Sequence, residues 1–267
     1  MSGDLPAGFY EVPGRAARYR EGRALPLETT RQWIDVIRRA VGMHQVRLGV
    51  DVGAGTGRFT RILAEALGAP VVAVEPSAGM TDERETKDDA SIRYVRGVAE
   101  ALPMERGVAD VIQMSMVYHQ LRDAPTAVAE MRRALRAGGL ALVRTPTHET
   151  LSEFEWLRFF PETLDFTFAR MPAHGDLLRV FTRAGLPLHE HTVIRQRIAD
   201  NLADYAARVR RRAFSSLQAL PDDVWERRLA EFEMHCRSAP DCPVDEPVSL
   251  FVFEAAARDR SVSGRRT

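Results

Sequence analysis

Three glycines and one acidic residue carry the clearest chemical signal in the chain. In "LGVDVGAGTGRFT" (residues 48–60), Gly53, Gly55 and Gly57 follow an apolar run and precede a helical pattern. Glycines in such a turn let a ligand approach the backbone, and the next helix offers free N–H groups to an anion. Glu75 ends the following apolar run, about 20 residues on, where a carboxylate can accept hydrogen bonds from both ribose hydroxyls. These residues predict a nucleoside site.

The glycine spacing separates this turn from two common nucleotide motifs. The pattern is G-x-G-x-G, with Asp51 just before it, whereas the dinucleotide fingerprint is G-x-G-x-x-G. The spacing therefore supports a ribose and gives no specific support for a pyrophosphate. No GKS or GKT segment follows the turn, which argues against the P-loop nucleotide hydrolases.

Apolar runs alternate with helical patterns along the chain and must position this turn. The predicted strands span residues 46–52, 70–76, 91–97, 109–117, 140–146, 187–198 and 247–257. Such alternation is typical of a parallel sheet whose ligands bind at the carboxyl ends of the strands. We therefore predict an α/β fold, with a Rossmann-like, mostly parallel seven-stranded sheet, helices on both faces and inserted helical cap elements.

Two stretches interrupt the alternation, and we interpret them as cap insertions in a single domain over residues 1–267. The insertions are residues 149–172 and 199–244, and the second is predicted to begin with one helix from Leu202 to Leu217. Residues 1–45 are expected to form N-terminal cover helices, and residues 46–148 the ligand-binding core.

Composition limits the possible partners. Lys+Arg and Asp+Glu both number 37, so the net charge gives no reason to expect nucleic acid or an anionic membrane. No apolar run is long enough to span a membrane, and the N-terminus has no apolar signal segment. The spacing of Cys236 and Cys242 is not typical of a metal site, so none is expected. We expect a reduced, cytoplasmic protein.

Residues 46–146 resemble the class I S-adenosylmethionine-dependent methyltransferases of small molecules. "VDVGAGTGRFT" is similar to their first motif, "VVAVEPSAGM" to the second, and "VRGVAEALPMERGVADVIQMSMVYHQLRD" and "EMRRALRAGGLALV" to the later blocks, in order. The segment "ARYREGRALP" resembles the Tyr-x-x-x-Arg segment that covers the cofactor in this group, here Tyr19 and Arg23. The resemblance implies S-adenosyl-L-methionine as the cofactor.

The resemblance also implies roles for individual positions. The glycine loop would line the methionine half of the cofactor, Asp51 would orient that loop or bind the amino group, and Glu75 would accept the ribose hydroxyls. Pro76, Ser77 and Met80 would line the adenine, and Ser115 would face the sulfonium. The implied cofactor contacts are Tyr19, Arg23, Asp51, Gly53, Ala54, Gly55, Gly57, Glu75, Pro76, Ser77, Met80, Val98, Ala99, Glu100 and Ser115.

One position departs from the family. Many relatives carry Asp where this chain has Val98, and that acid meets the adenine amino group. The adenine contact that the family makes through this acid is therefore not expected at Val98. Glu100 either substitutes for the missing acid or is a solvated surface charge.

The residues after the fourth predicted strand are candidates for the methyl-transfer step. A general base is needed only if the acceptor must lose a proton, and His119 has a side chain suited to that work near neutral pH. A structural role for His119 is equally open. Tyr19 could pair with His119 or cover the sulfonium with its ring. We take His119 and Tyr19 as the catalytic candidates.

An aromatic-rich stretch points to the kind of acceptor. Residues 154–168 hold six of the chain's twenty aromatic side chains, and no single helical face carries them all. Aromatic side chains over a pocket suit a flat or apolar acceptor. The predicted substrate contacts are Tyr10, Tyr118, His119, Trp156, Phe159, Phe160 and Arg170.

A basic run, "RVRRRA" (residues 208–213), could hold a phosphate or carboxylate, or contact RNA. Because it lies opposite the apolar stripe of its predicted helix, a solvated helix face is the favoured interpretation. Arg23 and Arg170 lie nearer the predicted pocket and are better candidates to bind an acidic group.

The leading hypothesis is methyl transfer to a small, partly apolar or aromatic metabolite, by O-, N- or C-methylation, in secondary metabolism. An RNA or protein methyltransferase is the second hypothesis, and a non-methylating protein that binds S-adenosylmethionine is the third. The expected partner is a small molecule, without nucleic acid or membrane. The sequence leaves the oligomeric state open.

Overall fold

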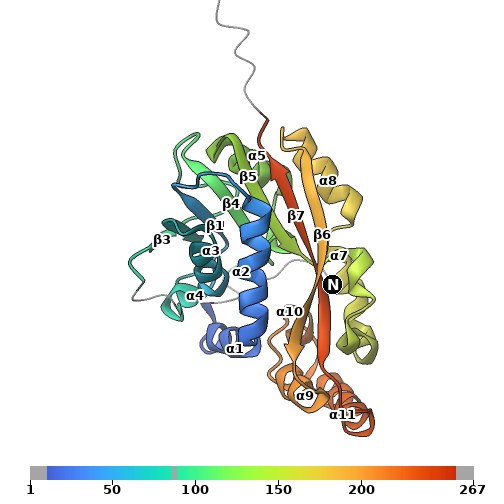
Figure 1. Ribbon diagram of the computed structural model, residues 1–267. Helices are drawn as coiled ribbons and strands as arrows, with labels where there is room; N and C mark the ends of the chain where they lie inside the picture. Colours follow the sequence, from blue (N-terminus) through green and yellow to red (C-terminus); the bar gives the residue numbers. More distant parts are fainter. Residues whose placement is uncertain (1–10, 86–88, 257–267) are drawn as a thin grey trace, which may run out of the picture.

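The computed structural model describes residues 11–85 and 89–256, and its centre is a seven-stranded sheet in the order β3-β2-β1-β4-β5-β7-β6 (Figure 1). The strands are β1 (Gly49–Val52), β2 (Val71–Glu75), β3 (Ile92–Arg96), β4 (Ala109–Ser115), β5 (Leu135–Thr145), β6 (Leu188–Ala199) and β7 (Val244–Glu254). β7 runs antiparallel to β5 and β6, and the remaining pairs are parallel. The predicted Rossmann-like, mostly parallel seven-stranded sheet is confirmed.

Helices cover both faces of the sheet. α2 (Leu27–Val41) and α3 (Arg58–Leu67) pack on one face, and α5 (Ala124–Ala134) and α8 (His174–Arg183) on the other (Figure 1). Trp33 of α2 is fully buried and packs edge to face on Phe59 of α3, with the two ring centres 5.8 Å apart. α2 was expected to cover the site, but its apolar stripe packs on the sheet instead.

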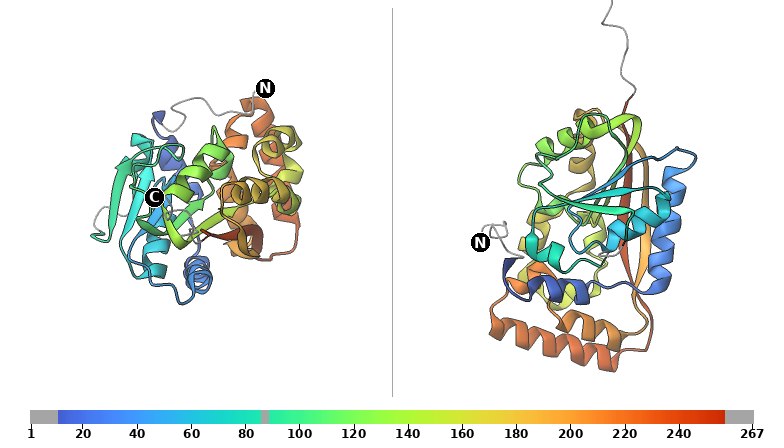
Figure 2. Two further views of the ribbon diagram at one scale, coloured as in Figure 1. Left: turned by 90° about the horizontal axis from the view of Figure 1, so that it is seen from above. Right: turned by 90° about the vertical axis from the view of Figure 1, so that its left-hand side faces the viewer.

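The carboxyl ends of the parallel strands carry a cover of helices. α1 (Arg15–Gly22) and α4 (Ala78–Asp82) lie at this end, joined by an ion pair of 2.8 Å between Arg20 and Glu83. Figures 1 and 2 show α1 and the helices of the second insertion beyond the same end of the sheet. The short helix η2 (Tyr118–Gln120) follows β4 there.

The two insertions build a separate apolar core, which we call the cap core. The first holds α6 (His148–Leu151), η3 (Glu155–Phe159), η4 (Pro161–Thr163) and α7 (Leu164–Arg170). The second holds α9 (Leu202–Arg210), α10 (Ser215–Gln218) and α11 (Asp222–Ser238). Phe160, Tyr205 and Phe232, from both insertions, are fully buried together.

The prediction of a single helix from Leu202 to Leu217 is wrong, because the segment forms two helices, α9 and α10. Arg212 has φ +51°, in the left-handed region, so the chain turns between α9 and α10. Its guanidinium donates hydrogen bonds to the carbonyls of Leu217 and Leu220 and pairs with Asp222, which holds the turn. A left-handed residue ends a helix because its backbone cannot continue the ladder.

Among the described residues, every helix is too short or too polar to cross a membrane. The same residues contain no cluster of three His, Cys, Asp or Glu side chains able to hold a metal ion.

Candidate functional site

The glycine loop after β1 has the backbone geometry that only glycine adopts easily. Gly53, Gly55 and Gly57 have φ of +71°, +57° and +84°. A Cβ on Gly53 would lie 2.4 Å from Cγ2 of Val117, so the loop and the residues after β4 approach too closely for a side chain. The N–H groups of Gly53 and Ala54 both donate to the carbonyl of Val74, at 2.8 and 3.1 Å, which fixes the loop against β2.

Glu75 links that loop to the start of α4. One carboxylate oxygen accepts from the N–H of Gly55 at 2.8 Å, and the other from the N–H of Ser77 at 2.9 Å. Burial raises the pKa of Glu75, and these two hydrogen bonds oppose the rise. A carboxylate has acceptor positions beyond two, so Glu75 can still receive two ribose hydroxyls.

Asp51 lies beneath the loop and joins α3 to β4. Its two oxygens accept from Oγ1 of Thr60 at 2.6 Å and from Nε2 of Gln113 at 3.1 Å. The side chain is almost completely buried, and that burial raises its pKa to about 6. The hydrogen bonds of Asp51 therefore hold α3 and β4 together beneath the loop. The loop backbone itself donates to Glu75, through the N–H of Gly55.

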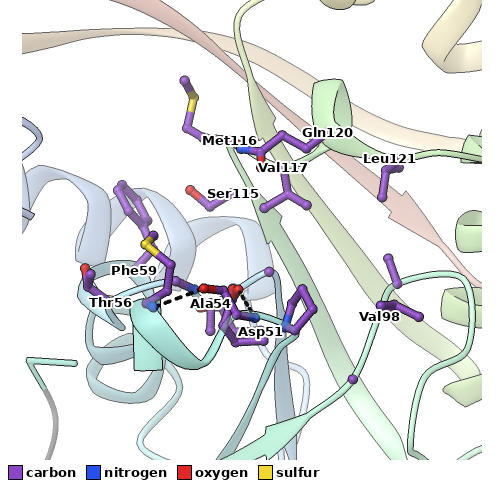
Figure 3. Close-up of a pocket in the computed structure, with 18 of the residues that line it drawn as sticks. Asp51, Ala54, Thr56, Phe59, Val98, Ser115, Met116, Val117, Gln120 and Leu121 are labelled. Carbon is purple, nitrogen blue, oxygen red and sulfur yellow. Dashed lines mark hydrogen bonds between the residues drawn. The ribbon is translucent and has the colours of Figure 1, made fainter. Parts of the chain in front are cut away.

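A large cavity of about 880 Å³ opens where these elements meet. Figure 3 shows Val98 and Leu121 on one side of it, and Thr56 and Phe59 on the other. The sequence-predicted residues that line it are Tyr19, Asp51, Gly53, Ala54, Gly55, Glu75, Pro76, Ser77, Met80, Val98, Ala99, Glu100, Ser115, His119 and Arg170. Cavities of several hundred Å³ are of the size that holds cofactors and small molecules.

Two predicted cofactor contacts lie outside this cavity. Gly57 is the N-cap of α3, where its left-handed backbone lets the helix begin. Arg23 instead lines a second, smaller cavity, with its guanidinium 4.5 Å from the ring centre of Phe214. Glu100 lines the large cavity, is partly exposed, and accepts hydrogen bonds from the N–H groups of Arg122 and Asp123.

The second cavity has a volume of about 80 Å³ and lies between the sheet edge and the cap. The two cavities share Tyr19, Arg58, Met116, His119 and Gln120 in their walls. The two spaces are therefore neighbours across one layer of side chains. Both catalytic candidates, Tyr19 and His119, are in that layer.

His119 differs from the expectation in its protonation. Burial lowers its pKa to about 3, with further lowering by the positive charges of Arg170 and Arg23. Its buried Nδ1 has no hydrogen-bond partner among the described residues. The imidazole is therefore neutral at pH 7 and can accept a hydrogen bond, but it is a weak base.

Several predicted substrate contacts are placed elsewhere. Tyr118 stacks on Phe181 of α8 with the ring centres 6.4 Å apart, and it lines neither cavity. Phe160 is in the cap core between Trp156 and Trp225, and Phe159 packs on α11, so these two are also away from both cavities.

Of the remaining predicted substrate contacts, Trp156 lines the second cavity and Arg170 lines the large cavity. Tyr10 lies outside the described residues.

The structure adds residues that the sequence did not single out. The additional lining residues of the large cavity include Thr56, Arg58, Phe59, Met116, Val117, Gln120, Leu121 and Arg122. In the second cavity, Arg144, Gln196 and Glu246 are polar side chains buried in strands β5, β6 and β7. The one available signal was Arg144 itself, a charge inside the apolar run "LALVRTP".

Comparison with known proteins supports the cofactor half of the site. Residues 50–143 match the family model described as a methyltransferase domain. The chain is 34% identical over 122 residues to malonyl-[acyl-carrier protein] O-methyltransferase of Serratia marcescens, covering 45% of this chain and 47% of that protein. It is 33% identical over 132 residues to demethylmenaquinone methyltransferase of Renibacterium salmoninarum, covering 49% and 54%. The matches thus span about half the length of these relatives.

A solved structure extends the likeness of the fold. It is described as a candidate methyltransferase from an antibiotic biosynthesis pathway of Anabaena variabilis. It superposes with a TM-score of 0.67 at 16% identity, over 82% of this chain and 96% of that one. The matched domain contains both the glycine loop and Glu75, which follow and end the neighbouring strands β1 and β2 and so lie at the carboxyl ends of those strands. Residues 50–143 of the chain therefore match a methyltransferase domain, and the sheet around them has the same fold as that solved structure.

Proposed function

We propose that this protein transfers the methyl group of S-adenosylmethionine to a small, partly apolar or aromatic metabolite. The observation that carries the proposal is the pair of neighbouring cavities. The larger has the glycine loop and Glu75, and the smaller has Tyr19, His119 and the cap in its walls. Cofactor and acceptor would meet at the shared wall, where their reacting atoms can be held in line.

The lining of the second cavity supports an acceptor with an apolar part. Leu25, Phe154, Trp156, Ile198 and Phe214 contribute to its wall beside the polar side chains. Trp156 stacks on Phe214 with ring centres 4.8 Å apart, so a flat aromatic surface is present. One of the curated relatives is named for demethylmenaquinone and the other for a malonyl group on an acyl-carrier protein, so both names specify a small organic group as the acceptor.

The acceptor atom and the pathway are part of the proposal. Because His119 is neutral and a weak base, an acceptor that needs no strong base for transfer suits the site best. O-, N- and C-methylation are distinguished by the product. We place that product in secondary metabolism, and its identity tests this assignment.

The decisive experiment uses methyl-labelled S-adenosylmethionine and a fractionated metabolite extract from the source organism. We expect the label in one small organic product, and far less of that product with the Glu75→Gln variant when S-adenosylmethionine is limiting. Label in RNA or protein fractions would overturn the proposal in favour of a macromolecular acceptor. Cofactor binding without any transfer would support a non-methylating protein instead.

A further inference from the structure

Four arginines from four different elements converge on the second cavity. Arg23 follows α1, Arg58 begins α3, Arg144 lies in β5 and Arg208 lies in α9. Each pair of neighbours is close enough for their charges to interact. Burial lowers the pKa of Arg144, and the positive charges of Arg58 and Arg23 lower it further. Burial also lowers the pKa of Arg208, to about 10, with a further contribution from the charges of Arg23 and Arg58.

Three of these arginines have a buried donor without a partner. The buried Nε atoms of Arg58, Arg144 and Arg208 make no hydrogen bond within the described part of the chain. Arg144 is 4% exposed, yet it bonds only to uncharged oxygens, Oε1 of Gln196 at 2.6 Å and Oγ of Ser115 at 3.3 Å. Buried polar groups are normally satisfied, so several unused donors beside one cavity indicate a missing acceptor.

The local charge is strongly positive. The ion pairs of the described residues use other arginines, and Glu246 is the one carboxylate in the described wall of the second cavity. Glu246 is itself 3% exposed and accepts a hydrogen bond from the hydroxyl of Tyr205 at 2.9 Å. One carboxylate cannot balance four guanidinium groups, and buried charges are normally paired. A further anion would complete the site.

The size and the lining of the cavity suit a carboxylate joined to an apolar group. A volume of about 80 Å³ holds several water molecules, and therefore a small anionic group. Guanidinium groups bind carboxylates in a planar, bidentate geometry. Leu25, Phe154 and Ile198 of the same wall offer contacts to carbon. An inorganic anion would leave those apolar side chains unused.

We propose that the second cavity binds the carboxylate of the methyl acceptor, through Arg144, Arg58, Arg208 and Arg23. This inference rests on the proposed methyl transfer and names its substrate class as carboxylic acids. The anion would lie beside His119, in the wall that the two cavities share, and Arg144 would connect it to Ser115 of the large cavity. A carboxylate is already ionised at neutral pH, so no proton has to be removed before it binds.

The test measures binding of matched probes to the full chain with and without S-adenosylhomocysteine. The probes are butyrate and benzoate, their primary amides, and inorganic phosphate, titrated by calorimetry. We expect the better acid to bind at least about tenfold more tightly than its amide, because only the acid carries the charge that the arginines need. Acids and amides that bind equally would overturn the proposal, and so would phosphate binding more tightly than either acid.

Variants of α9 and β7 separate the site from general charge effects. Arg208→Gln should weaken acid binding severalfold, whereas Arg210→Gln, which removes an exposed arginine of the same helix that pairs with Glu233, should leave it unchanged. Glu246→Gln should strengthen acid binding, an outcome that damage to the fold would not produce. Equal effects of the two arginine variants would overturn the proposal.

Binding of S-adenosylhomocysteine gives an independent readout. If it fails in the wild type, the proposed methyl transfer is contradicted, and the titrations without it still decide the second cavity. If it is intact while acids and amides bind alike, only the carboxylate site is wrong.

Discussion

Replacing Glu75 by Gln tests the cofactor site most directly. Glu75 is 7% exposed, at the end of β2, and its two oxygens already accept the N–H groups of Gly55 and Ser77. The substitution keeps the shape of the side chain and removes its charge. It also places an NH₂ group opposite one of the two backbone donors, so one of these two hydrogen bonds, to the loop or to the start of α4, is lost.

The expected loss follows from the hydrogen bonds that the carboxylate can still make. Two acceptor positions remain for ribose hydroxyls, and Gln can offer only one good acceptor oxygen. Since a hydrogen bond to a charged group contributes about 1.5–3 kcal/mol, losing one should weaken cofactor binding by about 2 kcal/mol, or about 30-fold.

Calorimetric titration with S-adenosylhomocysteine measures this loss. The matched control is Glu65→Gln on α3, which removes an exposed carboxylate and should bind like the wild type. A Glu75→Gln protein that is folded by circular dichroism and binds within about threefold of the wild type would refute the ribose assignment, since that difference is under 1 kcal/mol.

Three further predictions concern stability. Gly53→Ala should destabilise the protein by about 1–3 kcal/mol more than Gly107→Ala in urea unfolding, because both have positive φ but only Gly53 has Val117 within 2.4 Å of the new Cβ; equal losses would contradict this. Asp51 has a folded-state pKa of about 6, raised above its usual 3.8, so its ionisation costs stability as pH rises. From pH 5 to pH 7.5 the ligand-free wild type should lose about 1.4 kcal/mol relative to Asp51→Asn, and a slope of the opposite sign would disprove the burial argument. Phe160→Ala should cost about 3–5 kcal/mol of unfolding free energy while leaving the affinity for S-adenosylhomocysteine unchanged; weaker cofactor binding at unchanged stability would return Phe160 to the site.

The sheet and the cofactor loop could be predicted because their signals are local. The strands of the matched domain are short apolar runs, and Gly53 to Gly57 is a turn that needs glycine. Glu75 follows its strand directly, so its position at the carboxyl edge comes from the chain order alone. Each of these predictions needed only the residue pattern of one short segment of the chain.

The acceptor side could not be predicted in this way because it depends on contacts between distant segments. The aromatic side chains of residues 154–168 suggested a pocket, but most of that signal belongs to the cap core, where Phe160 packs against Trp225 and Phe232 of α11. Likewise, the arginines of the basic run at residues 208–213 differ in their exposure, which the sequence pattern did not show. Arg210 and Arg211 are exposed, whereas Arg208 turns toward the second cavity.

The division between the two halves of the site has a physical consequence for specificity. The methyltransferase domain match ends at residue 143, one position before Arg144. Of the four converging arginines, only Arg58 lies within the match; Arg23 precedes it, and Arg144 and Arg208 follow it. The residues expected to hold the cofactor thus lie mostly within the matched segment, and three of the four arginines expected to hold the acceptor lie outside it. Changes in the cap should therefore alter which acid is bound and leave the cofactor affinity intact, because Glu75 and the glycine loop make their own hydrogen bonds without any cap residue.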